Sequence, residues 1–202
     1  MGSDGITHGP LDPGTVHLCV DMQRIFAPGS LWSTPWMERV LPRVTALAER
    51  HAAQTLFTRF IPPERPEDRP GAWQRYYRRW REATREHLDP ALLELVEPLA
   101  RLAPPAETID KPTYSAFAAG ALPQRLAARE VHTLVVTGAE TDVCVLATVL
   151  GAVDRGYRVI VVSDAICSSS DAGHDALMTM YRGRYALQIE VATTEEILSA
   201  WS

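Results

Sequence analysis

The chain has 202 residues, of which 46% are hydrophobic and 22% are charged, and its formal net charge is -5. This length suits one soluble domain with a sizeable core, and the composition is ordinary for a globular protein. The acidic balance gives no basic footprint for nucleic acid, and no apolar run is long enough to cross a bilayer, so we expect neither a nucleic-acid nor a membrane partner. The three cysteines, Cys19, Cys144 and Cys167, are widely spaced, which argues against a disulfide framework and favours the reducing cytoplasm.

Residues 1–14 are polar and rich in glycine and proline, and they lack the apolar core of a signal peptide or membrane anchor. We expect a flexible N-terminal arm over residues 1–14 and a single domain over residues 15–202. From there the first half of the chain alternates between short apolar runs and stretches with helical spacing. It predicts, in order, a strand at 16–20, a helix at 37–51, a strand at 55–58, a proline-rich loop at 62–71, a helix at 72–85 and a short helix from 89.

The second half of the chain continues the alternation of strand and helix. It predicts strands at 107–110 and 133–137, a helix from 143 to Gly156, a strand at 158–162, a helix from 171, a strand at 187–191 and a terminal helix from 193. Such alternation is typical of an α/β fold. We therefore expect a single three-layer domain with a six-stranded, mostly parallel sheet and helices on both faces.

Three reactive residues follow predicted strands. Asp21 comes after the first strand, Lys111 after the third and Cys144 after the fourth. Ligands of open α/β sheets bind just beyond the carboxyl ends of the strands, so these side chains are expected to meet there. Lys111 is the only lysine among the 20 lysines and arginines, which indicates a position where a planar guanidinium would not serve. The alternative is a surface lysine retained by chance.

The expected position of Cys144, in the first turn of a helix, suits a nucleophile. Unpaired amides and the helix dipole stabilise a thiolate there, as does a nearby ammonium. A thiolate attacks carbonyl carbon, and it then needs a proton acceptor and donors aimed at the developing oxyanion. Asp21 suits the first role and Lys111 the electrostatic support, although an aspartate at a strand end is often only a cap.

Three motifs together resemble the isochorismatase-like cysteine hydrolase superfamily, which includes nicotinamidases, N-carbamoylsarcosine amidohydrolases and ureidoacrylate amidohydrolases. They are CVDMQ at residues 19–23, Asp110-Lys111 followed by YSAF at 114–117, and GAETDVCV at 138–145. Each motif alone is weak, but the three occur in the order of the family. The resemblance covers roughly residues 15–200.

The resemblance implies a catalytic triad of Asp21, Lys111 and Cys144. It also implies a cis peptide between Glu140 and Thr141, which makes an oxyanion hole from the backbone amides of Glu140 and Cys144. Members of the superfamily have a six-stranded, mostly parallel sheet and commonly assemble as dimers or tetramers. We therefore expect a homo-oligomer.

The sequence departs from two branches of the superfamily. Metal-using nicotinamidases carry an Asp-x-His pair after the second strand, whereas residues 57–62 read FTRFIP and no histidine lies between His51 and His87. We therefore expect no metal and no other cofactor. The isochorismatases proper cleave a vinyl ether and lack the nucleophilic cysteine, so the presence of Cys144 favours acyl chemistry.

The sequence thus predicts a metal-independent cysteine amidohydrolase that cleaves a C–N bond of a small amide or ureido compound through a Cys144 thioester, releasing ammonia or an amine. A first alternative is an isochorismatase-type hydrolase of a non-amide substrate, which would survive the loss of Cys144. A second is a non-catalytic binding or assembly protein on the same fold, which an unreactive Cys144 would favour.

The substrate-binding residues are harder to place. Our candidates are Phe26, Trp32, Arg59, Tyr114 and Phe117, and the alternative for the aromatic ones is plain core packing. The arginine- and aromatic-rich segment 62–85 either caps the pocket or packs as an amphipathic helix on the sheet or on a neighbouring subunit. Packing roles are expected for the remaining candidates, Cys19, Cys167 and His174.

Overall fold

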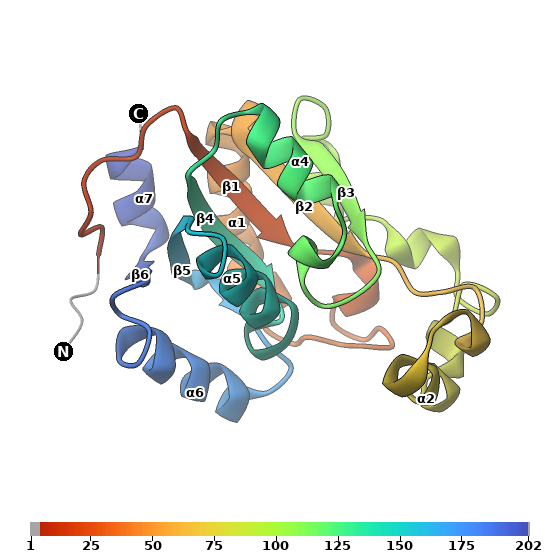
Figure 1. Cartoon of the computed structure of the whole chain (residues 1–202). Coiled ribbons are helices and arrows are strands. Elements are labelled where there is room, and N and C mark those ends of the chain that lie inside the picture. Colours follow the sequence, from red (N-terminus) through yellow and green to blue (C-terminus); the bar gives the residue numbers. More distant parts are fainter. Residues whose placement is uncertain (1–4, 202) are drawn as a thin grey trace.

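The centre of the molecule is a sheet of six parallel strands in the order β3-β2-β1-β4-β5-β6. It is seen in a computed structural model that describes residues 5–201 (Figure 1). The strands are β1 (Thr15–Val20), β2 (Thr55–Phe60), β3 (Glu107–Lys111), β4 (Thr133–Ala139), β5 (Arg158–Cys167) and β6 (Ile189–Ala192). The predicted α/β class and the parallel sheet are confirmed.

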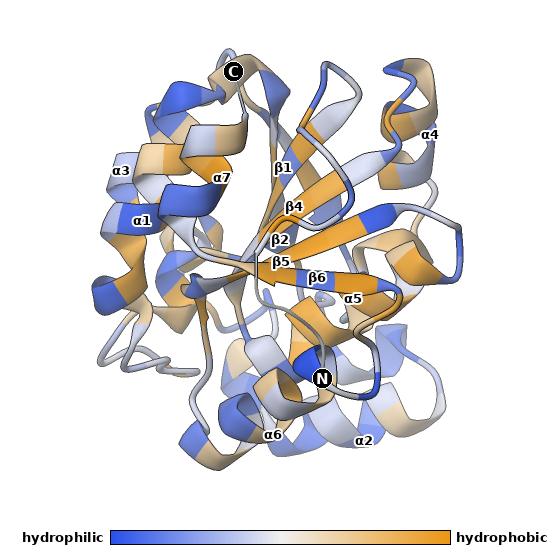
Figure 2. Ribbon diagram, turned by 90° about the vertical axis from the view of Figure 1, so that its left-hand side faces the viewer, coloured by the Kyte–Doolittle hydropathy of each residue, from blue (hydrophilic) through white to orange (hydrophobic). Residues whose placement is uncertain are grey.

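Helices cover both faces of this sheet and complete the three layers. They are α1 (Met37–Arg50), α2 (Gly71–Arg79), α3 (Glu97–Ala100), α4 (Ala121–Ala128), α5 (Leu146–Val153), α6 (Asp171–Arg182) and α7 (Thr194–Ala200). Figure 2 shows α1, α3 and α7 on one side of the strands and α4 and α5 on the other. Within residues 5–201, none of these helices combines the length and the apolar character that crossing a bilayer requires.

The strands are buried on both faces, as the short apolar runs predicted. Every residue of β1 is buried. Successive side chains alternate between the two faces, so Cys19 joins the apolar cluster beneath α1, whereas Leu18 and Val20 join the cluster beneath α5. Burial of both faces fixes the register, and it leaves the strand ends as the places where polar chemistry is accessible.

The strand order reverses direction at the middle of the sheet. From β1 the chain adds β2 and β3 on one side, and then it crosses over to add β4, β5 and β6 on the other. The carboxyl ends of β1 and β4 are therefore neighbours at the switch point, where ligands bind in folds of this kind. This topology brings the ends of the first and fourth strands together, as the sequence predicted.

The predicted elements differ from the structure at several helices. The helix expected at 72–85 is shorter, because α2 ends at Arg79 and a 3₁₀ turn follows at Arg81–Ala83. The helices α3 and α4 were not predicted. Short 3₁₀ turns fill several connections: Arg24–Phe26, Ala52–Gln54, Pro66–Asp68, Pro90–Leu93 and Ala116–Ala118.

The described part of the expected flexible arm contacts the domain. The amide of Gly5 donates to the carbonyl of Val191 at 2.7 Å. Leu11 forms a short parallel bridge with Trp201, and both side chains are buried. Residues 1–4 of that arm lie outside the described residues. From residue 5 onward, the segment is thus held against β6 and the C-terminal end of the chain.

Candidate active site

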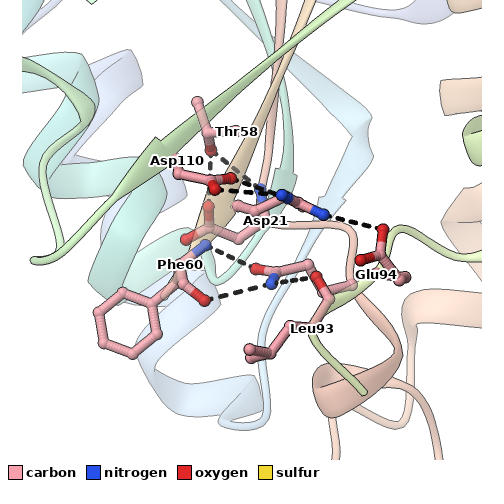
Figure 3. A network of polar contacts seen from close by, with 8 residues as sticks. Asp21, Thr58, Phe60, Leu93, Glu94 and Asp110 are labelled. Carbon is pink, nitrogen blue, oxygen red and sulfur yellow. Dashed lines mark hydrogen bonds and ion pairs between the residues drawn. The ribbon is translucent and has the colours of Figure 1, made fainter. Parts of the chain in front are cut away.

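Asp21 occupies the position directly after β1, and its side chain is fully buried. Its backbone has a φ of +49°, a left-handed conformation that aspartate adopts more readily than most residues. The hydroxyl of Thr58 on β2 donates to Oδ1 of Asp21 at 2.6 Å, and the Asp21 amide donates to the Thr58 carbonyl at 3.2 Å. The turn after β1 and the neighbouring strand therefore hold one carboxylate oxygen in place (Figure 3).

The second carboxylate oxygen of Asp21 pairs with Lys111, the last residue of β3. The distance from Lys111 Nζ to Asp21 Oδ2 is 2.6 Å, and both side chains are 0% exposed. The ammonium also donates to the carbonyl of Thr113 at 3.0 Å and lies 5.1 Å from the centre of the Phe60 ring. A charge pair taken out of water persists only when its remaining donors and acceptors are also satisfied. The lone lysine is thus a buried partner of Asp21.

Cys144 completes the cluster from the other side of the switch point. It is 5% exposed, and its thiol is in hydrogen-bonding contact with both Asp21 and Lys111. Burial raises the pKa of the Cys144 thiol, and the Asp21 carboxylate raises it further, while the Lys111 ammonium lowers it by less. The pKa therefore lies well above its ordinary value, so the resting form is a thiol.

The same cluster acts on the ammonium of Lys111. Burial alone lowers the pKa of Lys111, but the charges and hydrogen bonds of Asp21 and Cys144 outweigh that effect, and the pKa is raised. The lysine thus keeps its proton at neutral pH. In the resting site a neutral thiol lies beside a carboxylate–ammonium pair.

The close approach of β1 and β4 depends on Gly138. Its φ is +106°, which side chains rarely adopt, and a Cβ at this position would overlap the backbone of Val20. The register pairs Val20 with Gly138, so the residues that follow the two strands begin side by side. This contact is what brings the loop of Asp21 and the turn of Cys144 together.

The backbone before Cys144 forms a π-helical turn, Thr141–Val145, and α5 follows it. The Glu140 carbonyl accepts from the amides of Val143 at 3.1 Å and Val145 at 3.0 Å. Cys144 lies inside this turn, between the two donors. Turns of this kind are frequent at functional sites.

The cis peptide lies between Ala139 and Glu140. Our prediction of a cis bond between Glu140 and Thr141 was therefore wrong by one residue. Glu140 has an extended backbone and caps the π-helical turn, and Thr141 is already the first residue of that turn. Helical hydrogen bonding continues only through trans peptides, so the bond into the turn is trans.

A cavity of about 130 Å³ opens onto Cys144. Three of the predicted substrate-binding residues, Phe26, Trp32 and Tyr114, line it. Glu140, predicted for the oxyanion hole, and Tyr76, from the segment 62–85, also line it. The lining residues that the sequence did not reveal are Phe60 and Val143. Phe60 is the last residue of β2, and its place at a strand end is the sequence signal that could have identified it.

Two predicted binding residues lie elsewhere. The guanidinium of Arg59 donates to Asp110 and to Glu94, both at 2.8 Å, in a partly exposed network (Figure 3). Phe117 is buried in the apolar cluster beneath α5, where its ring centre lies 5.8 Å from that of Tyr157. Neither residue lines the cavity, so these two assignments are corrected.

The segment 62–85 contributes to the walls of the cavity. The ring centres of Trp32 and Tyr76 are 6.1 Å apart, and those of Trp32 and Trp80 are 6.2 Å apart. The ring centres of Trp73 and Tyr114 are 4.7 Å apart. Of our two interpretations of this segment, the structure therefore supports the one in which it caps the pocket.

The other residues with reactive side chains have packing roles. Burial raises the pKa of Cys19 to about 12, and burial likewise raises that of Cys167. His174 contacts the Thr141 hydroxyl at 2.9 Å and the Trp36 ring at 5.8 Å. In the described part of the chain, no group of three or more His, Cys, Asp and Glu side chains is arranged to hold a metal ion. Residues 57–62, FTRFIP, lie where metal-using nicotinamidases would carry their Asp-x-His pair, and they offer neither a carboxylate nor an imidazole ligand.

Comparison with known proteins agrees with this geometry. The family model described as the isochorismatase domain matches residues 15–196. An uncharacterized isochorismatase family protein of Bacillus subtilis is 32% identical over 81 residues, which are 40% of this chain and 44% of that protein. The matched stretch thus spans less than half the length of this curated relative.

Solved structures share the fold over most of the chain. A cysteine hydrolase from Pseudomonas syringae pv. phaseolicola is 26% identical, with a TM-score of 0.79 and full coverage of both chains. N-carbamoylsarcosine amidase from Thermoplasma acidophilum is 22% identical, with a TM-score of 0.70 and coverage of 90% of this chain and 96% of that one. At the latter identity the likeness shows the fold alone.

Proposed function

Because this chain belongs to the isochorismatase family of hydrolases, we propose that it is a cysteine amidohydrolase that cleaves a C–N bond of a small amide or ureido compound through a thioester on Cys144. The observation that carries the proposal is the buried Asp21–Lys111 pair in contact with a thiol at the base of the cavity. No step is assigned to a metal ion, since the described residues offer no ligand cluster.

In the first half of the proposed reaction, the thiol becomes a nucleophile only when a substrate is present. The raised pKa of Cys144 keeps the proton on sulfur at rest. As Sγ attacks the carbonyl carbon, Asp21 takes that proton, and the carbonyl oxygen gains negative charge. The Cys144 amide, together with the Glu140 amide, donates to this oxyanion. The C–N bond then breaks, and Asp21 returns the proton to the departing ammonia or amine.

In the second half, water replaces the leaving group. Asp21 takes a proton from the water, whose oxygen attacks the thioester carbon, and the same amides hold the second oxyanion. Collapse of this intermediate breaks the C–S bond, releases a carboxylic or carbamic acid and returns the proton to sulfur. Each turnover consumes one amide and one water.

In this mechanism Lys111 stabilises charge and does not transfer a proton. Its raised pKa keeps it cationic, and it contacts both Asp21 and Cys144. The ammonium therefore stabilises the thiolate as it forms and orients Asp21 toward the sulfur. Preorganised charges in a site without water act strongly, because little reorganisation is needed during the reaction.

The proposal is tested by measuring ammonia release from a panel of small amides and ureido acids, with wild-type enzyme and with Cys144→Ala. We expect release from at least one compound by the wild type and a loss of nearly all activity in the variant, because the nucleophile is gone. Circular dichroism of both proteins controls for folding.

Two results would contradict the proposal. Hydrolysis that persists in Cys144→Ala would indicate an isochorismatase-type reaction that needs no thiol. No release from any compound, together with a Cys144 thiol that does not react with iodoacetamide, would indicate a binding protein on this fold.

A further inference from the structure

The lining of the cavity above Cys144 carries a negative charge, which the proposed chemistry does not require. Five of its lining side chains are aromatic, and the only charged one is Glu140. None of its lining residues is a lysine, arginine or histidine. The nearby ammonium of Lys111 is fully buried and already paired with Asp21. The cavity therefore combines aromatic walls with a carboxylate and has no free cation.

Five aromatic side chains line the cavity, and Trp32 is at their centre. The ring centre of Trp32 lies 5.9 Å from that of Phe26, 5.9 Å from that of Phe60 and 6.1 Å from that of Tyr76. The cavity of about 130 Å³ is close to the size of about 150 Å³ at which an apolar cavity holds a benzene molecule. A group bound here lies next to several aromatic side chains at once. Aromatic faces carry partial negative charge, and they attract a desolvated cation.

The carboxylate of Glu140 is fixed at the wall of this space. Its Oε2 accepts from the amide of Ser169 at 2.8 Å and from the Ser169 hydroxyl. Burial raises the pKa of the Tyr76 hydroxyl, and the nearby Tyr114, Cys144 and Glu140 raise it further. The charge of Glu140 therefore makes the electrostatic potential inside the cavity more negative.

The arginines of the segment 62–85 do not offset the negative charge of Glu140 in the lining of the cavity. Arg79 stacks over the ring of Trp80, with 5.2 Å from its guanidinium carbon to the ring centre. The charge of Arg69 acts on Tyr77, a fully buried residue that does not line the cavity. Neither arginine lines the cavity. Among the residues that line the cavity, a substrate carboxylate would thus meet Glu140 and no cationic side chain.

We propose that this cavity selects small amides whose acyl part carries a compact cation, such as a trimethylammonium group, held by the rings around Trp32 and by the carboxylate of Glu140. The inference rests on the proposed function, since it names the substrate class of that same site. It also predicts that acidic substrates of similar size are excluded.

Three amides of matched size test this selection by binding to Cys144→Ala, which cannot turn them over. They are trimethylammonioacetamide, its neutral isostere 3,3-dimethylbutanamide, and malonamate, which is anionic. By isothermal titration calorimetry we expect the cation to bind about tenfold more tightly than the isostere, with malonamate weakest of the three. A higher salt concentration should reduce the difference in affinity between the cation and its neutral isostere.

A charge variant identifies the group responsible. In the Cys144→Ala background, Glu140→Gln should reduce the preference for the cation over its isostere. Glu97→Gln is the matched control, because it removes the same charge from an exposed carboxylate that pairs with Arg24 at the surface. That control should leave the preference unchanged. Equal binding of all three amides, tighter binding of malonamate, or binding of none of them would overturn the inference.

Turnover by the wild type separates the two claims. If Cys144→Ala prefers the cation but the wild type releases ammonia from none of the amides, the proposed reaction is wrong and the selection stands. If the wild type releases ammonia without regard to charge, the reaction stands and the selection is wrong. A preference in both assays supports the two together.

Discussion

Two ion pairs formed by consecutive residues at the end of β3 lie in opposite environments. Asp110 pairs with Arg59 at 2.8 Å, and their side chains are 50% and 22% exposed. Lys111 pairs with Asp21 at 2.6 Å, and both side chains are 0% exposed. One pair is a surface network and the other is the base of the candidate active site, although the distances are nearly the same.

The difference follows from strand geometry. Side chains alternate across a strand, so Asp110 and Lys111 point to opposite faces of β3. Their partners in register on β2, Arg59 and Phe60, alternate in the same way. The Arg59–Asp110 pair is still in contact with solvent, which weakens the attraction between the two charges. The buried pair has lost its water, so each charge depends on the other. Burial, more than distance, makes a charge pair useful for chemistry.

The largest expected effect is a difference in stability between variants that break the two pairs. Replacing Lys111 with alanine leaves the Asp21 carboxylate buried without its partner, so we expect the free energy of unfolding to fall by about 3–5 kcal/mol. Arg59→Ala should cost less than about 1 kcal/mol. Urea unfolding followed by circular dichroism measures both. Equal losses in the two variants would contradict the contrast between the pairs.

A pair of reciprocal substitutions sharpens the contrast through activity. Lys111→Arg puts a wide, planar group into a site with no exposed area, and displacement of the neighbouring carboxylate should reduce kcat by about 10²-fold. Arg59→Lys makes the opposite exchange at the surface and should leave kcat within about twofold. The rates are compared on whichever amide the wild type hydrolyses. A fully active Lys111→Arg enzyme would remove the special role of the only lysine.

How far the sequence predicted these sites depends on which rule was applied. The rule that reactive residues gather at strand ends brought Asp21, Lys111 and Cys144 together correctly, because a parallel sheet aligns those ends. The choice of Arg59 relied on its charge and did not consider the acidic side chains beside it. Asp110 and Glu94 both accept hydrogen bonds from its guanidinium, and Arg59 does not line the cavity.

Other misses had different physical causes. The cis peptide was misplaced by one bond because a motif locates a segment and not its individual dihedral angles. Tyr76 enters the cavity from α2, a segment distant in sequence from the strand ends, and only the packing of the whole fold brings it there. The sequence placed Cys144 in a helix turn that stabilises a thiolate, but it could not show that burial and Asp21 raise the pKa of this thiol.

His17, in the middle of β1, is a third buried polar group. It tests whether burial also sets the protonation state of a side chain elsewhere in the sheet. Its ring nitrogens contact the hydroxyls of Thr55 at 3.2 Å and Thr137 at 2.8 Å. Burial, aided by the nearby His51, lowers the pKa of His17 from 6.5 to about 3. Between these values the unfolded chain binds a proton that the folded chain excludes. Stability from this group is therefore complete above pH 6.5 and is lost as the pH falls toward 3.

The expected slope is about 1.4 kcal/mol per pH unit in this range. His17→Gln should show a smaller loss of unfolding free energy than the wild type between pH 6 and about 4. The control is His87→Gln at an exposed position, which should follow the wild type. An unchanged acid slope in His17→Gln would show that this imidazole is not held neutral by the fold.

The smallest expected effect concerns salt. The Arg59–Asp110 pair is partly exposed, so raising the ionic strength from low values to about 1 M should remove most of its contribution, which is already below about 1 kcal/mol. The difference in unfolding free energy between wild type and Arg59→Ala should shrink accordingly. The penalty of Lys111→Ala should persist, because salt does not enter the buried site. A penalty for Lys111→Ala that disappears in salt would mean that this site is open to solvent.

The most direct measurement is iodoacetamide labelling of the three cysteines in the native protein, mapped by peptide mass spectrometry alongside ammonia release. All three thiols are buried, but only Cys144 lines the cavity. We predict that Cys144 alone is labelled, faster as the pH rises because its pKa is raised, and that activity falls in proportion to its labelling. Full activity with Cys144 completely alkylated would contradict its role as the nucleophile.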